Sequence, residues 1–309
     1  MKITIFGTGG VGGYFGARLA QAGCDVGFVA RGAHLAALRE RGLRVSSELG
    51  DVTLPAVRAA ADPRELGTPD WAFVCVKLWD TDAAVAALAP ALGPDSAVVS
   101  FQNGVQKDDV LRAAFGPGRV VGGVAYISAG IAEPGVIRHT GKLARLVFGE
   151  HDGRESARTA ALLAAAQRAG VDAAIAPDVR RAIWEKFAFL VGMSGATASM
   201  RTTIGPVREH PRTRAFLLGL MREVVAVGRA QGVALPEDFA DGRLAFIDTL
   251  PPQMEASLAT DVRLGRRLEL AWLSGAVADL GEACGVATPL NAAVRDVLAL
   301  HVDGAPPRA

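Results

Sequence analysis

The sequence has few cysteines and no long uncharged hydrophobic run. Its 309 residues contain three well-separated cysteines, Cys24, Cys75 and Cys284, whose spacing fits neither a disulfide framework nor a metal site. We therefore expect reduced thiols and no bound metal. No apolar run could span a bilayer, and the N-terminus lacks the small-residue cleavage site of a signal peptide. These absences favour a cytoplasmic protein.

An excess of charge of either sign is also absent, because 33 basic and 32 acidic residues nearly balance. The formal net charge is only +1, which gives no indication of a nucleic-acid or membrane partner. We expect a small molecule to be the main partner instead. A chain of this length that is 50% hydrophobic can bury a large core and is expected to form two domains.

A glycine-rich segment directly after the first predicted strand is the most informative motif. The strand covers residues 2–6, and a helix pattern follows at 14–20. In a GxGxxG turn between strand and helix, the glycines allow a tight turn, close approach of a pyrophosphate and close helix packing. The helix N-terminus then faces the phosphates. The residues predicted to bind a dinucleotide are Gly7, Thr8, Gly9, Gly10, Val11 and Gly12.

The end of the second predicted strand, residues 25–30, favours NADP(H) over NAD(H). In NAD sites an acidic residue at this position binds the ribose 2′-hydroxyl. Here Arg31 occupies it, and a guanidinium can form charge-assisted bonds with a 2′-phosphate. The alternative is that Arg31 is a solvated loop cation.

The pattern of strands and helices changes character near residue 178. Before it, short apolar runs at 72–76 and 97–101 are typical of buried parallel strands. Further strands are predicted at 120–126, 136–139 and 144–148, separated by turns that contain glycine and proline. After it, helical patterns dominate, at 179–200, 212–231, 268–284 and 291–301. We predict an α/β protein with an N-terminal Rossmann-type dinucleotide-binding domain at 1–177 and an all-α substrate domain at 178–309, with the substrate between them. Residues 304–309 are expected to be a frayed tail.

Two charged residues stand in apolar stretches of the predicted helical domain. Lys186 shares its helix face with Ile183, Leu190 and other apolar side chains, and Glu269 is followed by Trp272. Buried charges need partners, and removal of one partner typically costs about 3–5 kcal/mol. The two charges could therefore meet at a cleft. Alternatively, the lysine could extend its ammonium into water, and the glutamate could pair with a nearby arginine.

These residues together resemble the ketopantoate reductase (2-dehydropantoate 2-reductase) family along nearly the whole chain. Besides the glycine motif and Arg31, the matching residues are Lys77 in Val-Cys-Val-Lys, Asn103 in Gln-Asn-Gly, Lys186 in Trp-Glu-Lys-Phe, Ser257 and Asp261 in Ser-Leu-Ala-Thr-Asp, and Glu269. The resemblance implies NADPH-dependent reduction of a 2-oxo acid to a D-2-hydroxy acid, with a homodimer as the candidate assembly.

The resemblance also implies roles for single residues. Lys186 would donate the proton to the developing alkoxide, and Glu269 would orient it. Lys77 and Asn103 would bind the cofactor, and Asn103 would also contact the substrate, together with Lys186. Ser257 would bind the substrate carboxylate. From the residues alone, Lys77 could equally be a solvated strand-end lysine, Asn103 a turn residue, Ser257 a helix cap and Asp261 a helix-surface carboxylate.

Two positions that follow Lys186, and two that follow Glu269 (Ala271 and Ser274), depart from the family pattern. Where the family usually has asparagines that bind the substrate hydroxyl, this chain has Leu190 and Ser194. Loss of such polar contacts removes most discrimination for a hydroxyl, so an apolar 2-oxo acid fits the implied substrate site better. Two other classes remain open: a hydroxy-acid dehydrogenase of the 3-hydroxy acid or 6-phosphogluconate type, and a non-catalytic NADP(H)-sensing protein.

Overall fold

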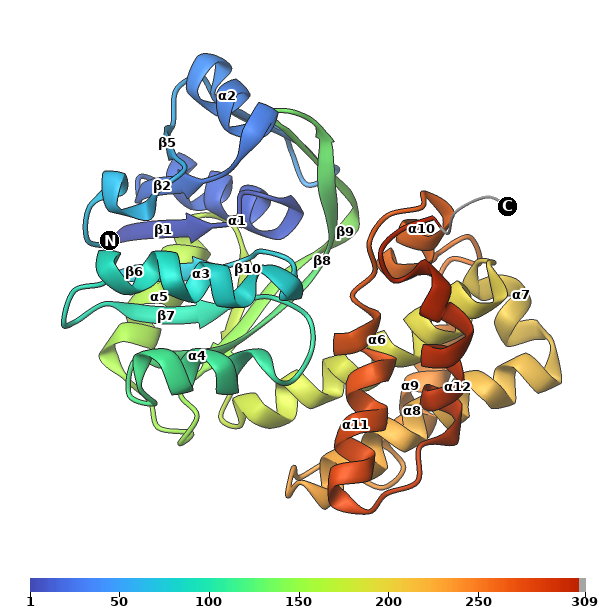
Figure 1. Ribbon diagram of the computed structural model, residues 1–309. Helices are drawn as coiled ribbons and strands as arrows, with labels where there is room; N and C mark the ends of the chain where they lie inside the picture. Colours follow the sequence, from blue (N-terminus) through green and yellow to red (C-terminus); the bar gives the residue numbers. More distant parts are fainter. Residues whose placement is uncertain (306–309) are drawn as a thin grey trace. The chain divides into compact units, whose positions relative to one another are not determined.

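The computed structural model describes residues 1–305, and these form two compact units, one of Met1–Val179 and one of the described residues from Arg180 onward. The predicted tail at 304–309 lies largely outside the described residues. Among the helices that are described, none is both long and apolar enough to cross a membrane. Figure 1 shows that strands are confined to the first unit and that the second is helical. This arrangement confirms the predicted fold class.

Six parallel strands form the core of the first unit. They lie in the order β5-β2-β1-β6-β7-β8, which is the strand order of a Rossmann sheet. Their bounds are β1 Lys2–Phe6, β2 Asp25–Val29, β5 Arg58–Ala60, β6 Trp71–Val74, β7 Ala97–Ser100 and β8 Val120–Glu133. The strand order reverses between β1 and β6, and ligands of such sheets bind beyond the carboxyl ends of the strands at this point.

Helices connect these strands and bury apolar faces against them. The helices are α1 Gly10–Gln21, α2 Gly32–Arg41, α3 Thr81–Leu88, α4 Lys107–Phe115 and α5 Ala157–Arg168, with short 3-10 turns η1 Pro63–Leu66, η2 Leu78–Asp80 and η3 Ala89–Ala91. Ile3 and Ile5 of β1 pack with Phe15 of α1 and Phe28 of β2 in one continuous core. This core holds the carboxyl ends of β1, β2 and β6 in place.

A long antiparallel ribbon leaves the Rossmann sheet where β8 separates from β7. β8 pairs with β7 only at Val120 and Val121, and beyond them with β9, Val136–Gly149. Figure 1 shows these two long strands extending past the others. The remaining strands, β3 Leu43–Ser46, β4 Val52–Leu54 and β10 Asp172–Ile175, pair on the outer side of β9 or of β3.

The prediction of two separate strands at 136–139 and 144–148 was wrong. Both belong to β9, and the residues between them form an irregularity inside the strand, where the register with β8 shifts between Ile127 and Ala129. Gly141 has a φ of +79° there, and the Nε2 of His139 lies 3.1 Å from the Leu143 carbonyl oxygen. In the sequence, a glycine at this place suggests a chain reversal. In the structure, Gly141 marks a bulge instead.

The second unit contains only helices within its described residues. They are α6 Val179–Met200, α7 Ile204–Glu209, α8 Pro211–Ala230, α9 Phe239–Asp248, α10 Ser257–Arg263, α11 Ser274–Cys284 and α12 Pro289–Leu298, with 3-10 turns η4 Leu270–Trp272 and η5 Ala299–His301. Helix α6 has the predicted bounds. Gly192 of α6 permits close packing against α8, because a Cβ there would lie 2.5 Å from the Met221 Cγ.

The helix predicted at 268–284 is interrupted. Leu273 has φ −108° and ψ −107°, outside the helical region, and α11 begins only after it. Glu269 therefore lies at the start of η4 rather than on a helix face shared with Leu273 and Ala276. The apolar spacing of this segment is compatible with a helix and does not show the break at Leu273.

Candidate functional site

The glycine motif forms a tight loop at the carboxyl end of β1. Gly7 has a φ of +101°, and a Cβ there would lie 2.7 Å from the Val76 amide nitrogen of the loop after β6. The carbonyl of Val29 accepts hydrogen bonds from the amides of Gly7 and Thr8 and from the Thr8 hydroxyl. Thr8 is buried and thus fixes the loop to β2 instead of exposing its side chain.

The next residues leave room for an anion at the start of α1. A Cβ on Gly12 would lie 2.3 Å from the Gly7 carbonyl oxygen, whereas a Cβ on Gly9 would meet nothing within 4 Å. The first turn of α1, which begins at Gly10 and includes Val11, has no acidic residue and no side-chain cap. Its amides and the positive end of its dipole are therefore available to phosphate. This cradle fits the pyrophosphate of a dinucleotide.

Arg31 follows β2 at the same edge of the sheet and forms an ion pair. Its guanidinium donates to the Asp80 carboxylate at 2.8 Å, with the arginine side chain 74% and the aspartate side chain 25% exposed. Arg31 is thus not a solvated loop cation without a partner. Asp80 lies in the connection between β6 and α3, and sequence reasoning gave it no role.

Lys77 and Asn103 lie on the two neighbouring loops. Lys77 is exposed directly after the β6 loop, with its Nζ 5.6 Å from the centre of the Trp79 ring. Asn103 is half-buried in the connection from β7 to α4. Both loops follow carboxyl ends of strands β6 and β7, so the structure brings the predicted coenzyme residues of this unit to one edge of one sheet.

A buried hydrogen-bond chain joins these two loops. The Gln102 amide donates to the Thr81 hydroxyl at 2.9 Å and accepts from the Ser100 hydroxyl at 2.9 Å. Thr81 in turn donates to the Leu78 carbonyl at 2.7 Å. Gln102 is 6% exposed, and its place directly before Asn103 is the signal that the sequence offers for it. The chain fixes the position of the segment that carries Lys77 and Asp80.

The predicted residues of α6 lie on a largely buried helix. Lys186 and Leu190 are half-buried and one turn apart, and Ile183 and Phe187 of the same helix are buried. Ser194 follows one turn after Leu190 and is 0% exposed, and its hydroxyl has no hydrogen-bond partner among the described residues. The ammonium of Lys186 therefore belongs to a stretch of α6 with buried apolar side chains.

Glu269, Ser257 and Asp261 occupy different environments in the same unit. Glu269 is 5% exposed and Asp261 is 9% exposed, whereas Ser257 is exposed at the first position of α10. Arg266, the alternative partner considered for Glu269, lies 3.9 Å from the Asp261 carboxylate. A buried carboxylate such as Glu269 requires a compensating polar partner.

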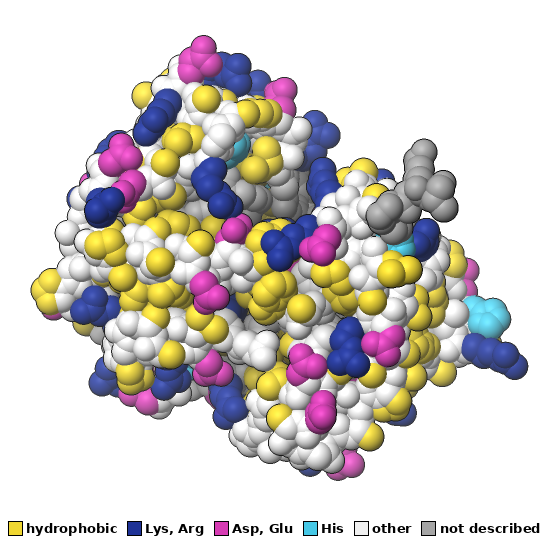
Figure 2. Space-filling view, in the orientation of Figure 1, with side chains coloured by type: hydrophobic (Ala, Val, Ile, Leu, Met, Phe, Trp, Pro, Cys, Tyr) yellow, Lys and Arg dark blue, Asp and Glu magenta, His cyan; other side chains and the backbone are white. Residues whose placement is uncertain are grey.

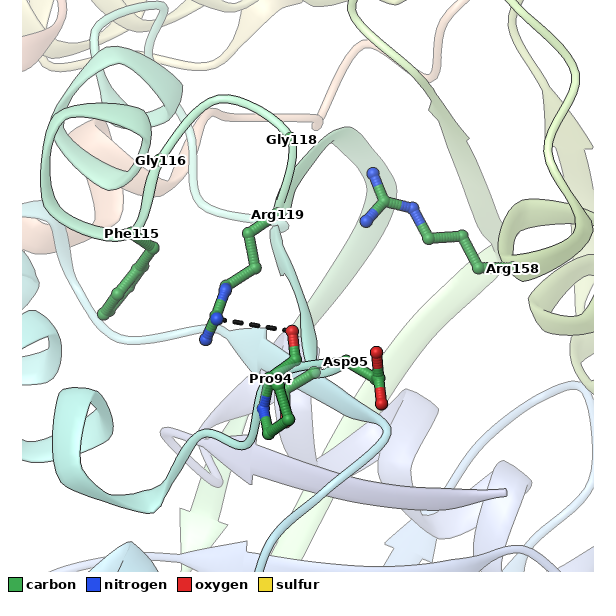
Figure 3. A pocket seen from close by; sticks show the side chains of 8 residues that line it. Pro94, Asp95, Phe115, Gly116, Gly118, Arg119 and Arg158 are labelled. Atoms are coloured by element: carbon green, nitrogen blue, oxygen red, sulfur yellow. Dashed lines mark hydrogen bonds between the residues drawn. The ribbon is translucent and has the colours of Figure 1, made fainter.

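A pocket of about 390 Å³ lies elsewhere on the first unit, near the amino ends of β7 and β8. Figure 3 shows Arg119 and Arg158 in its lining, with Arg119 bonded to the Pro94 carbonyl. The Arg158 guanidinium donates to both carboxylate oxygens of Glu150. This pocket is at the opposite edge of the sheet from the glycine loop, and its cations are already paired.

The strand order and the glycine cradle, joined to a helical unit, define a dinucleotide-dependent oxidoreductase. Comparison with known families extends this conclusion to both units. The family described as "Ketopantoate reductase PanE/ApbA" matches residues 3–153, and "Ketopantoate reductase PanE/ApbA C terminal" matches residues 178–301. The chain belongs to the ketopantoate reductase family, and it is an NADP-dependent oxidoreductase that acts on a CH–OH group, as the sequence predicted.

Individual relatives agree over nearly the full length. The chain is 34% identical to a 2-dehydropantoate 2-reductase of Mesorhizobium japonicum, over 95% of each chain. The crystal structure of 2-dehydropantoate 2-reductase from Geobacter metallireducens GS-15 has a TM-score of 0.90 at 31% identity, covering 97% of this chain and 99% of the other. A PanE/ApbA family ketopantoate reductase from Ralstonia eutropha JMP134 has a TM-score of 0.89 at 33% identity, covering 98% of both.

Proposed function

We propose that this protein reduces 2-dehydropantoate, or a 2-oxo acid with a more apolar side chain, to the corresponding D-2-hydroxy acid with NADPH. The observation that carries the proposal is the combination of an open phosphate cradle at Gly9 with the half-buried ammonium of Lys186, which lies among buried apolar residues of α6 in the same chain. Relatives named 2-dehydropantoate 2-reductase support the substrate class.

The proposed reaction needs a hydride, a proton and a fixed substrate carboxylate. Reduced nicotinamide, when bound, supplies the hydride to the ketone carbon. Lys186 donates a proton to the ketone oxygen, and its positive charge stabilises the negative charge that develops there. Glu269 keeps the lysine protonated and oriented, Ser257 binds the carboxylate, and Asn103 contacts both coenzyme and substrate.

The residues around the substrate side chain favour an apolar group. Leu190 offers no hydrogen bond, and the Ser194 hydroxyl is fully buried within its own unit. A site without a polar partner for a substrate hydroxyl discriminates weakly in its favour. Activity assays with ketopantoate, 2-oxoisovalerate and phenylglyoxylate therefore show which of these substrates the enzyme prefers. Each assay is run with NADPH and, in parallel, with NADH.

Lys186→Ala tests the proposed proton donor. We expect it to bind NADPH as the wild type does but to lose about 10²–10⁴-fold in kcat, the usual contribution of a general acid. Lys186→Arg keeps the charge but donates a proton poorly and should lose nearly as much. Lys142→Ala, which removes an exposed lysine of β9, serves as the control. Wild-type turnover by Lys186→Ala would remove this residue from the mechanism.

The location and the assembly are part of the same proposal. We propose that the enzyme works in the cytoplasm as a homodimer. Its cysteines, Cys24, Cys75 and Cys284, are all free thiols, which suits a reducing compartment. Val297 and Leu300 are 64% and 81% exposed near the end of the described chain, which suits an apolar contact between subunits. Light scattering after size-exclusion chromatography distinguishes dimer from monomer.

A further inference from the structure

The ion pair between Arg31 and Asp80 combines two features that normally belong to different coenzyme sites. An arginine after the second Rossmann strand suits a 2′-phosphate, whereas an acidic residue suits the free ribose 2′-hydroxyl of NAD. In this protein the acid comes from the connection between β6 and α3, and its Oδ2 lies 2.8 Å from the Arg31 NH2. The place where the ribose 2′ group of a coenzyme would bind, after the second strand, is thus within reach of both a cation and a carboxylate.

Asp80 is the fixed member of the pair. It is the N-cap residue of α3 but makes no side-chain cap bond, although aspartate usually caps a helix in this position. The following residue, Thr81, is bonded both to the Leu78 carbonyl and to the buried Gln102 amide. The backbone that carries the Asp80 carboxylate is therefore anchored to β7.

Arg31 is the adjustable member. Its side chain is 74% exposed, and within the described residues its guanidinium makes one hydrogen bond, to Asp80. The remaining donors of the guanidinium fork are left for a second acceptor. A phosphate dianion could bind there, but only next to the carboxylate that already holds the arginine, and like charges at this range repel.

We propose that Asp80 sets the coenzyme preference of the enzyme. It accepts the ribose 2′-hydroxyl of NADH, and it weakens binding of the NADPH 2′-phosphate, so that both coenzymes are used and NADPH is only moderately favoured. The inference rests on the proposed function, because it assumes that the glycine cradle binds a nicotinamide dinucleotide.

Asp80→Asn tests this proposal, with Asp82→Asn as a matched control. Asp82 is an exposed acid in the first turn of the same helix, so its loss produces the same change in net charge and in helix-end charge. Calorimetry with 2′,5′-ADP and 5′-AMP measures the 2′-phosphate contribution without the nicotinamide. Initial rates with NADPH and NADH then give the preference in kcat/KM. A circular dichroism melt verifies that both variants are folded.

We expect Asp80→Asn to bind 2′,5′-ADP about tenfold more tightly and to raise the NADPH-to-NADH ratio of kcat/KM by about tenfold or more, since the variant removes an unfavourable charge contact with the 2′-phosphate. Asp82→Asn should change either quantity less than about twofold. Equal effects of the two variants would overturn the proposal. Weaker 2′,5′-ADP binding by Asp80→Asn would also overturn it, because Asp80 would then serve to orient Arg31.

The binding measurement separates this inference from the proposed function. A wild type that binds 2′,5′-ADP, shows the expected response to Asp80→Asn and yet reduces no 2-oxo acid would contradict the reaction but support the role of Asp80. A wild type that binds neither nucleotide would overturn both.

Discussion

Lys107, at the first position of α4, is a buried charged residue of the first unit. Its side chain is 3% exposed, and its ammonium donates to the Ser100 carbonyl, the Gly123 carbonyl and the Asp108 carboxylate at 2.9–3.0 Å. Strands β7 and β8 separate after Val99 and Val121, so the two carbonyls come from strands that no longer pair there. Lys107 fills this fork.

Replacement of Lys107 by methionine should lower the free energy of unfolding by about 3–5 kcal/mol, the usual cost of breaking a buried pair. The variant keeps the volume of the side chain but leaves Asp108 and two carbonyls without their donor. Urea unfolding measures the change. Lys142→Met, at an exposed position, should cost less than about 0.5 kcal/mol. An equally small effect at Lys107 would show that the ammonium is not required for the fork.

At the scale of elements, helix α1 is enclosed between the Rossmann sheet and the β8–β9 ribbon. Its glycines therefore allow close packing on two faces of the helix. Gly12 and Gly16 face β1 and β2, where a Cβ would contact Ile5 or Phe28, and Gly10 and Gly13 face the ribbon. A Cβ on Gly10 would lie 2.1 Å from the Ala129 carbonyl oxygen. The glycine-rich start of this helix thus reflects packing as well as phosphate binding.

Gly9→Ala and Gly10→Ala should separate these two functions. Gly10→Ala forces the backbone of β8 to move and should cost about 1–3 kcal/mol of stability or more. Gly9→Ala meets no protein atom within 4 Å, so its melting temperature should stay near that of the wild type. Its added methyl group occupies the space for the pyrophosphate, so NADPH affinity should fall by at least about tenfold. Thermal melts and NADPH titrations by fluorescence measure the two effects.

A marked loss of stability in Gly9→Ala, or wild-type NADPH affinity, would contradict the assignment of this open space to the coenzyme. A stable Gly10→Ala variant would instead show that the ribbon is free to move away from α1.

At the scale of the whole molecule, charges of both signs are interspersed over the visible surface (Figure 2), in keeping with the net charge of +1. Some carboxylates are buried instead, and two of them, Asp108 and Glu150, lie in the first unit. Burial alone would raise the pKa of Asp108, but the neighbouring Lys107 ammonium and the His151 imidazole hold that pKa below its ordinary value. Burial would also raise the pKa of Glu150, but hydrogen bonds from Arg158 and Ser156 outweigh this effect. The pKa of Glu150 is therefore lowered as well.

These lowered pKa values predict loss of stability in acid. A carboxylate whose pKa is lower in the folded than in the unfolded state stabilises the fold above its unfolded pKa, and that contribution disappears as the pH falls through the folded pKa. The free energy of unfolding should therefore decrease below about pH 4. Asp108→Asn should be less stable than the wild type at pH 7 but lose less on acidification, as measured by urea titrations at several pH values.

Asp109→Asn, an exposed acid of the same helix, is the control and should follow the pH profile of the wild type. An Asp108→Asn variant with the full acid-dependent loss would assign that loss to other groups.

Features that depend on contiguous residues could be predicted well from the sequence. The strand at 2–6, the glycine turn and the helix after it follow from local backbone preferences. The bounds of α6 follow from a helical pattern that begins after Pro177 and Asp178 and ends before the polar residues 201–203. The prediction was less accurate for 136–148 and 268–284. The bulge depends on the register of β9 with β8, a strand that local residue patterns do not align. The helix break lies at Leu273, in a segment whose apolar spacing is compatible with a continuous helix.

The sequence by itself determined the coenzyme class, the oxidoreductase family and the two kinds of domain, because these depend on the order and spacing of residues along the chain. Only the tertiary structure decided that Asp80 faces Arg31, that Gln102 connects two loops and that Lys107 fills the fork between β7 and β8. Each of these contacts is set by how strands and loops are brought side by side, and long-range pairing of that kind leaves no local signal in the chain.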